Sequence, residues 1–278
     1  MAFFSWLRRV RSKRIPPCSA VIAAAGYSQR MGGGDKLYAE IHGMPVLAHT
    51  LTAFQACGHV SEIIVVVRED CMELAGGICE KHGIGKVSKI MVGGPTRLSS
   101  VMNGVFAVSD KAELIAIHDG ARPCIEQGVI ERAIEAAAKH HAAAPGVPVS
   151  STLKKAKGGI VTETVDRDDL FEIQTPQAFK ASLIKAALTS ASNKSIEVTD
   201  DCRAVELIGA PVHIVEGSRG NIKITTSQDL IIAKAVLGVS GNDDPFYSLK
   251  NQARLTEAMD QLEAGLGVEH DLIEVNDD

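Results

Sequence analysis

Short apolar runs alternate with amphipathic segments along most of the chain. Residues 20–24 are a continuous apolar run. Residues 62–67 (EIIVVV) are a β-branched run without alternation, a pattern typical of a strand that is covered on both faces of a sheet. Residues 45–57 carry apolar side chains at helical spacing, and Pro45 suits a first helical turn. Further strands are expected at 87–92, 114–117 and 212–215, and further helices at 69–82, 99–108, 126–141, 180–191 and 228–237.

Strands that alternate with helices predict an α/β fold with a mostly parallel sheet, because right-handed βαβ units build such a sheet. Ligands of these sheets bind at the carboxyl ends of the strands, beside the point where the strand order reverses. The residues that directly follow each strand are therefore the first candidates for a functional site.

One stretch, at about 147–165, interrupts the alternation. Residues 147–149, 152–157 and 159–165 are expected to be extended segments, with a Lys-Gly-Gly turn between them. An isolated two-stranded hairpin is marginally stable in water, and one this polar supplies no core of its own. We therefore expect the hairpin to pack against the body of this chain or against another copy of it.

Charge is unevenly distributed along the 278 residues, whose net charge is −5. Residues 1–17 hold five basic and no acidic side chains, whereas residues 243–278 hold ten acidic and two basic ones. We expect a basic flexible tail at 1–17, a folded domain at 18–238 and an acidic extension at 239–278. The basic tail is not a secretory signal, because its charges follow the apolar patch instead of preceding it.

Composition excludes several classes of protein. No stretch approaches the roughly 20 apolar residues that cross a bilayer, so no membrane span is expected. Aromatic residues make up 4% of the chain and the body has no basic stripe, so nucleic acid is not an expected partner. The six cysteines are scattered without a Cys-x-x-Cys pair, which indicates reduced thiols of a cytoplasmic protein. The histidines form no pair with zinc-ligand spacing.

The loop after the first strand has the small residues that a phosphate ligand requires. Ala24, Ala25 and Gly26 let the backbone approach a ligand closely, and their N–H groups can bond phosphate oxygens. Arg30 and Lys36 add positive charge to the same loop. The glycine spacing is neither that of a Walker loop nor that of a dinucleotide fingerprint. A surface loop with incidental charges is the alternative.

The segment GGPTRLSSV, residues 93–101, follows the strand at 87–92. The Gly94 backbone and Ser100 are candidates for the lining of a nucleotide-base pocket. Alternatively, Ser99 or Ser100 caps the helix that follows.

The segment HDGARP, residues 118–123, follows the strand at 114–117. Asp119 is well placed to hold Mg²⁺, which prefers one or two carboxylates together with substrate phosphates. The alternative is a turn that an ion pair between Asp119 and Arg122 stabilises.

Four more polar segments are weak signals individually. Thr199 or Asp200 could be a helix cap, and Lys223 could be an exposed strand lysine. The four segments are Asp166-Arg167, QTPQ at 174–177, Val198-Thr199-Asp200 and NIKIT at 221–225.

Taken in order, these blocks resemble the 2-C-methyl-D-erythritol 4-phosphate cytidylyltransferase family over residues 19–237. The motifs that carry the resemblance are AAAG-x-x-x-RM…K, GG-x-x-R-x-x-SV, HD-x-ARP, TVDR, QTPQ-x-F, TD and VEG-x-x-x-NIK-x-T-x-x-DL. The resemblance implies a doubly wound, mostly parallel nucleotidyltransferase (Rossmann-like) sheet with a protruding β-arm that joins two copies in a homodimer. It also implies transfer of CMP from CTP to 2-C-methyl-D-erythritol 4-phosphate, with release of pyrophosphate, in non-mevalonate isoprenoid biosynthesis.

The resemblance assigns roles to residues of this sequence. It implies that Arg30, Lys36 and Lys223 are catalytic, and that Asp119 holds Mg²⁺. Nucleotide contacts are implied for Ala24, Ala25, Gly26, Gly94, Ser100, Asp119 and Gly120. Acceptor contacts are implied for Thr152, Arg167, Thr175, Thr199 and Lys223, of which Thr152 and Arg167 come from the neighbouring subunit's arm. Gly120 replaces the commoner Ala of the family, a change that should be tolerated where only the backbone is needed.

Two other functions remain open at this point. A ribitol 5-phosphate cytidylyltransferase has similar motifs, and the choice of acceptor depends on few side chains. A catalytically silent nucleotide-binding regulatory module is the alternative from another class, although Arg30, Lys36, Asp119 and Lys223 together speak against it.

Overall fold

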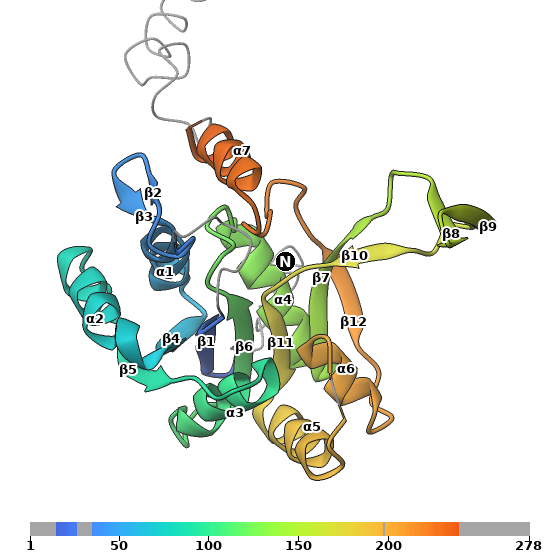
Figure 1. Cartoon of the computed structure of the whole chain (residues 1–278). Coiled ribbons are helices and arrows are strands. Elements are labelled where there is room, and N and C mark those ends of the chain that lie inside the picture. The colour runs from blue at the N-terminus through green and yellow to red at the C-terminus, as the bar shows by residue number, and fades with distance from the viewer. Residues whose placement is uncertain (1–14, 27–34, 197, 239–278) are drawn as a thin grey trace, which may run out of the picture. The chain divides into compact units, whose positions relative to one another are not determined.

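The computed structural model describes residues 15–26, 35–196 and 198–238 (Figure 1). The chain divides into two compact units, residues 1–233 and 234–278, and the fold below is that of the first unit. Most of the basic tail and the whole acidic extension lie outside the described residues, as does Arg30.

A twisted sheet of eight strands forms the centre of this unit, in the order β10-β7-β11-β6-β1-β4-β5, with β12 paired to β7. The pairings among β6, β1, β4 and β5 are parallel, and so is the pairing of β7 with β12. The other two strands, β10 and β11, run antiparallel to the strands beside them. The strands are β1 (Cys18–Ala24), β4 (Val60–Val67), β5 (Val87–Val92), β6 (Leu114–Asp119), β7 (Ala142–Pro148), β10 (Phe171–Ile173), β11 (Gln177–Lys180) and β12 (His213–Glu216).

Helices cover both faces of the sheet, so the predicted doubly wound α/β fold is confirmed (Figure 1). Successive strand residues point to opposite faces: Ile22 packs in one apolar cluster and Val21 in the other. The first cluster includes side chains of α1 (Val46–Ala56), α2 (Met72–Lys81) and α4 (Gln127–His140). The second includes side chains of α3 (Arg97–Ala107), α5 (Ala181–Asn193) and α6 (Asp201–Glu206).

The strand order reverses at β1. From β1 the chain adds β4 and then β5 on one side, and it then crosses over to add β6 on the other. A crevice at the carboxyl ends of the strands is expected beside such a reversal. This topology therefore directs the search for a site to the residues that follow β1, β4, β5 and β6.

The expected hairpin is present as a separate two-stranded sheet of β8 (Leu153–Lys157) and β9 (Ile160–Val165), which projects from the end of the sheet (Figure 1). Its expected first segment is wrong, because residues 147 and 148 belong to β7 of the central sheet. Gly158 and Gly159 form its turn with φ of 58° and 82°, a left-handed conformation that glycine adopts without strain. Ile160 and Val161 are 73% and 57% exposed. The arm thus presents apolar side chains to solvent in the single chain.

Several short elements were not expected from the sequence. They are the hairpin β2 (Glu40–Ile41) with β3 (Met44–Pro45), the 3₁₀ turn Glu69–Cys71 ahead of α2, and β10, β11 and α6. Pro45 ends β3 and precedes α1, so its expected place in the first helical turn is wrong by one residue. The helix expected at 228–237 is α7 (Ser227–Gly238), which crosses the boundary between the two units.

Candidate active site

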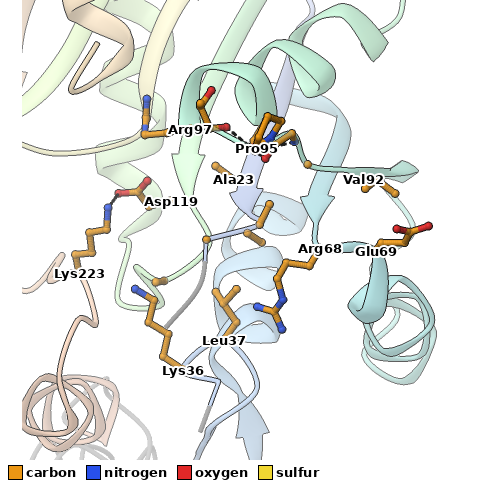
Figure 2. A pocket seen from close by; sticks show the side chains of 18 residues that line it. Ala23, Lys36, Leu37, Arg68, Glu69, Val92, Pro95, Arg97, Asp119 and Lys223 are labelled. Carbon is orange, nitrogen blue, oxygen red and sulfur yellow. Dashed lines mark hydrogen bonds and ion pairs between the residues drawn. The ribbon is translucent and has the colours of Figure 1, made fainter. Parts of the chain in front are cut away.

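A cavity of about 580 Å³ opens at the carboxyl ends of β1, β4, β5 and β6 (Figure 2). Figure 2 shows cationic side chains arranged around it from separate elements: Lys36, Arg68, Arg97 and Lys223. The cavity brings together eight residues that the sequence analysis selected: Ala24, Ala25, Gly26, Lys36, Gly94, Ser100, Asp119 and Lys223.

Close backbone packing shapes the wall after β5. A Cβ on Gly93 would lie 2.3 Å from the Ala25 Cβ, so only glycine fits between the two loops. The Ser100 hydroxyl accepts a hydrogen bond from the Gly94 N–H at 3.0 Å and lies 2.9 Å from the Thr96 carbonyl. Ser100 therefore holds the loop that lines the cavity.

The expected cap of α3 is wrong. Thr96 is the N-cap: its Oγ1 accepts from the Ser99 N–H at 3.0 Å, and the Ser99 Oγ accepts from the Thr96 N–H at 2.9 Å. Together they form a capping box. The helix begins at Arg97, two residues earlier than the apolar pattern indicates, and this places Ser99 and Ser100 inside its first turn.

Asp119 ends β6 and forms an ion pair with Lys223, whose Nζ lies 2.8 Å from Oδ2 (Figure 2). The Arg122 Nε lies 3.6 Å from the same oxygen, so the structural ion pair considered from the sequence is also present. Burial raises the pKa of Asp119, but the nearby charges of Lys223, Arg97 and Arg122 outweigh burial and hold this pKa at about 2. The carboxylate is therefore ionised at neutral pH.

The buried His118 is connected to the Asp119 backbone through the Thr175 hydroxyl. The His118 Nε2 lies 3.3 Å from the Arg122 carbonyl and its Nδ1 lies 3.0 Å from the Thr175 Oγ1. Since a carbonyl only accepts, Nε2 carries the proton and Nδ1 accepts from Thr175. The Thr175 Oγ1 in turn accepts from the Asp119 N–H at 3.2 Å. Burial lowers the pKa of His118 to about 4, so its ring is neutral.

Arg122 and Asn221 fix the segment that carries Lys223. The Arg122 Nη1 donates to the Asn221 carbonyl at 2.6 Å, and the Ile224 N–H donates to the Ala121 carbonyl at 2.8 Å. The buried Asn221 amide donates to the Thr175 carbonyl at 2.9 Å. The NIK and HD-x-ARP motifs are thus joined directly, which places Lys223 beside Asp119.

The other predicted residues that the structure describes do not line this cavity. Thr175 is 4% exposed, and its hydroxyl is engaged by His118 and Asp119. Thr199 precedes Asp200, whose side chain caps α6, as the sequence allowed. Thr152 and Arg167 lie at the base of the arm, where Arg167 donates to the Ser150 carbonyl. An alanine at position 120 would put its Cβ 3.1 Å from the Ala24 Cβ, a tight contact.

Two cations at the cavity were missed from the sequence. Arg68 follows β4 and pairs with Asp35 at 2.7 Å, and Arg97 opens α3 and pairs with Asp201 at 2.7 Å. Arg97 is the arginine of the GG-x-x-R-x-x-SV motif, so the sequence could have identified it as a candidate site residue. Arg68 lies outside every motif quoted above.

Among the described residues, no three His, Cys, Asp or Glu side chains are grouped so that they could hold a metal ion. None of the described helices is both long enough and apolar enough to pass through a membrane. All six cysteines are free thiols.

A mostly parallel sheet with cations and close-packed glycine loops at its switch point defines a nucleotidyltransferase-like α/β enzyme. The family model described as 2-C-methyl-D-erythritol 4-phosphate cytidylyltransferase matches residues 18–239. The chain belongs to this family.

Curated relatives and solved structures agree with the family match. The 2-C-methyl-D-erythritol 4-phosphate cytidylyltransferase of Halalkalibacterium halodurans is 42% identical over 79% of this chain and 96% of its own length. That of Pelotomaculum thermopropionicum is 42% identical over 79% of this chain and 93% of its own length. The crystal structure of 4-diphosphocytidyl-2C-methyl-D-erythritol synthase from Anaerococcus prevotii superposes with a TM-score of 0.72 at 34% identity, covering 80% of this chain and 96% of that one.

Proposed function

We propose that the protein transfers CMP from CTP to 2-C-methyl-D-erythritol 4-phosphate, forming 4-diphosphocytidyl-2-C-methyl-D-erythritol and pyrophosphate. This is a step of non-mevalonate isoprenoid biosynthesis. Family membership supports the activity. The main structural support in this chain is a single cavity lined by Lys36, by the Asp119–Lys223 ion pair and by Gly26 after β1.

In the proposed reaction an oxygen of the acceptor phosphate attacks the α-phosphorus of CTP, and pyrophosphate leaves. Both reactants are anions, so neutralising their charge and aligning them supplies most of the rate. Lys36 and Lys223 would stabilise the charge around the α-phosphorus from two sides of the cavity. Arg30, in the proposed catalytic set, lies outside the described residues. A phosphate oxygen is already nucleophilic at neutral pH, so no general base is needed.

The nucleotide would bind along the loops after β1 and β5. Ala24, Ala25 and Gly26 offer backbone N–H groups to the triphosphate, and Gly94 with Ser100 would face the cytosine. The close approach of Gly93 to Ala25 leaves no room for a side chain at position 93 between the two loops. We propose that Gly94 and Ser100 favour cytosine over a larger purine.

Asp119 has the chemistry of a magnesium ligand in this site. The carboxylate is ionised, and both of its ion pairs within the described residues reach Oδ2 and not Oδ1. Mg²⁺ commonly takes one or two carboxylates and completes its shell with water and substrate phosphates. When bound, the metal would neutralise phosphate charge and orient the triphosphate.

The acceptor site would be completed by a second copy of the chain. Thr152 and Arg167 do not line the cavity of their own chain, and the arm presents the exposed Ile160 and Val161. Arm exchange in a homodimer would cover these apolar side chains and bring Arg167 to the acceptor phosphate of the partner. Thr175 and Thr199 would be more distant acceptor contacts.

Pyrophosphate release from CTP with different acceptors tests the proposal. We expect release with 2-C-methyl-D-erythritol 4-phosphate and little release with ribitol 5-phosphate. Preferential turnover of ribitol 5-phosphate would identify the alternative cytidylyltransferase. Release with neither acceptor, in protein that binds CTP, would favour the catalytically silent regulatory module.

A further inference from the structure

An ion pair with a buried carboxylate connects α6 to the start of α3 at the cavity wall. The Arg97 Nη1 and Nη2 donate to the two carboxylate oxygens of Asp201 at 2.8 and 2.7 Å. Arg97 is the first residue of α3 and Asp201 is the first residue of α6. The Asp201 side chain is 1% exposed. Two parallel charge-assisted bonds fix both the distance and the orientation of the groups that they join.

The α6 end of this ion pair is itself held in place. The Gln177 Oε1 accepts from the Asp201 N–H at 3.0 Å and from the Cys202 N–H at 2.9 Å. The Gln177 amide also donates to the Asp200 Oδ2 at 2.8 Å. The turn that contains Thr199 is therefore attached to β11 through Gln177 and to α3 through Arg97.

The α3 end belongs to the wall of the cavity. Arg97 follows Thr96, the N-cap of α3, and its side chain lines the cavity (Figure 2). Burial lowers the pKa of Arg97, but the charge and hydrogen bonds of Asp201 outweigh burial and raise this pKa, so the guanidinium stays charged. Both terminal nitrogens of Arg97 donate hydrogen bonds to Asp201, so Arg97 is a weaker candidate for binding phosphate directly.

Stability alone does not explain an ion pair whose carboxylate is buried and whose guanidinium is 31% exposed. Apolar side chains of similar volume commonly stabilise a fold as well or better, because two charges must be taken out of water. A two-bond ion pair differs from an apolar contact in the precision with which it sets geometry. The two segments that it joins would carry the nucleotide and the acceptor in the proposed reaction.

We propose that Arg97 and Asp201 are positioning residues that hold the Thr199 turn at a fixed place relative to the nucleotide loop after β5, so that the acceptor phosphate meets the α-phosphorus in line. This role depends on the proposed function. Without the pair, the nucleotide loop keeps the bonds of Ser100 and the capping box of Thr96, whereas the Thr199 turn keeps its Gln177 bonds to β11 but loses its attachment to α3. The position of the acceptor relative to the nucleotide is therefore what the loss mainly disturbs.

The test replaces both charges together, by Arg97→Met with Asp201→Leu, so that no unpaired charge remains buried. We expect this variant to keep its melting temperature and its calorimetric Kd for CTP within about twofold. We expect kcat/KM for 2-C-methyl-D-erythritol 4-phosphate to fall about 10- to 100-fold, the scale for a misplaced reactant. Arg97→Lys keeps the charge but loses the two-bond geometry, and should give an intermediate value.

The matched control is Arg203→Met, which removes an exposed arginine of α6 that pairs with Glu206 at 3.2 Å. Its kinetics should equal those of the wild type. Wild-type kcat and acceptor KM in the folded paired variant would overturn the positioning role. If that variant does not fold, wild-type kinetics in folded Arg97→Lys would overturn it instead. A wild type that is inactive with these substrates would overturn the proposed function and this role with it.

Discussion

Lys36 is the residue whose charge the proposed chemistry needs most directly. It lines the cavity at the end of the loop after β1 and approaches from a different element than Lys223 (Figure 2). Lys36→Ala should lower kcat by about 10²- to 10³-fold, the usual effect of removing one group that stabilises transition-state charge. Steady-state kinetics measure this, and circular dichroism checks that folding is retained.

Lys139→Ala is the control for Lys36. It removes an exposed lysine from the last turn of α4, away from the cavity, and should leave turnover unchanged. Normal turnover in folded Lys36→Ala would remove Lys36 from the catalytic set.

His118 makes stability depend on pH. Its pKa is about 4 in the folded protein against 6.5 for the unperturbed group, so the unfolded chain binds more protons between these values. The free energy of unfolding therefore falls as pH decreases through this window, by about 3 kcal/mol for a shift of this size. Urea titrations at pH 7 and pH 4.5 should show the loss in the wild type.

The contribution of His118 is isolated by comparison with His118→Gln, which removes the titrating ring but keeps a polar side chain. We expect this variant to be less stable at pH 7 and to lose less stability on acidification. The pKa of Asp119, at about 2, affects stability only below its ordinary value of 3.8 and so outside this window. Equal pH dependence in both proteins would show that His118 is not the group responsible.

At the scale of the element, burial on both faces made the central strands predictable. After Glu62, the run at 63–67 is apolar throughout because its side chains pack in both clusters: Ile63 and Val65 in one, Ile64 and Val66 in the other. β11 has only four residues and α6 only six, too few for a periodic pattern. Both are held by tertiary contacts, such as the Gln177 bonds to the start of α6.

The candidate site was predictable to the extent that its residues follow strands. Asp119 is the last residue of β6 and Gly94 lies two residues after β5, and topology brings strand ends together. The contacts that hold the site together were not predictable, because they join residues distant in sequence. His118 contacts Thr175, and Asp201 contacts Arg97. A single sequence does not contain those pairings.

Gly104 lies where α3 packs closely against the sheet. A Cβ at this position would lie 2.4 Å from the Val21 Cγ1 and 2.7 Å from the Val66 Cγ2, both on central strands. Gly104→Ala should therefore destabilise the protein by about 1–3 kcal/mol through overpacking, despite the better helix propensity of alanine. Chemical denaturation measures the change.

Gly77→Ala is the matched control, since Gly77 lies inside α2 and a Cβ there meets no atom within 4 Å. Alanine should stabilise this helix by up to about 1 kcal/mol. If Gly104→Ala were as stable as Gly77→Ala, the close approach of α3 to β1 would be contradicted.

At the scale of the whole molecule, the proposed dimer builds each active site from two chains. Lys36 belongs to the body and Arg167 to the base of the arm, where it bonds Ser150 of its own chain. Lys36→Ala and Arg167→Ala should each be poorly active alone. A heterodimer of the two would pair an intact Lys36 with an intact Arg167 at one of its two sites.

Random subunit exchange between the two variants should therefore restore about a quarter of wild-type activity, since half of the dimers are mixed and each has one complete site. Activity after mixing and separation of the heterodimer by two affinity tags measures this. The control mixes Lys36→Ala carrying one tag with Lys36→Ala carrying the other, which should restore nothing. If Arg167 served its own chain, both sites of the heterodimer would lack one residue. A purified heterodimer without recovered activity would therefore place the arm's contribution in its own subunit.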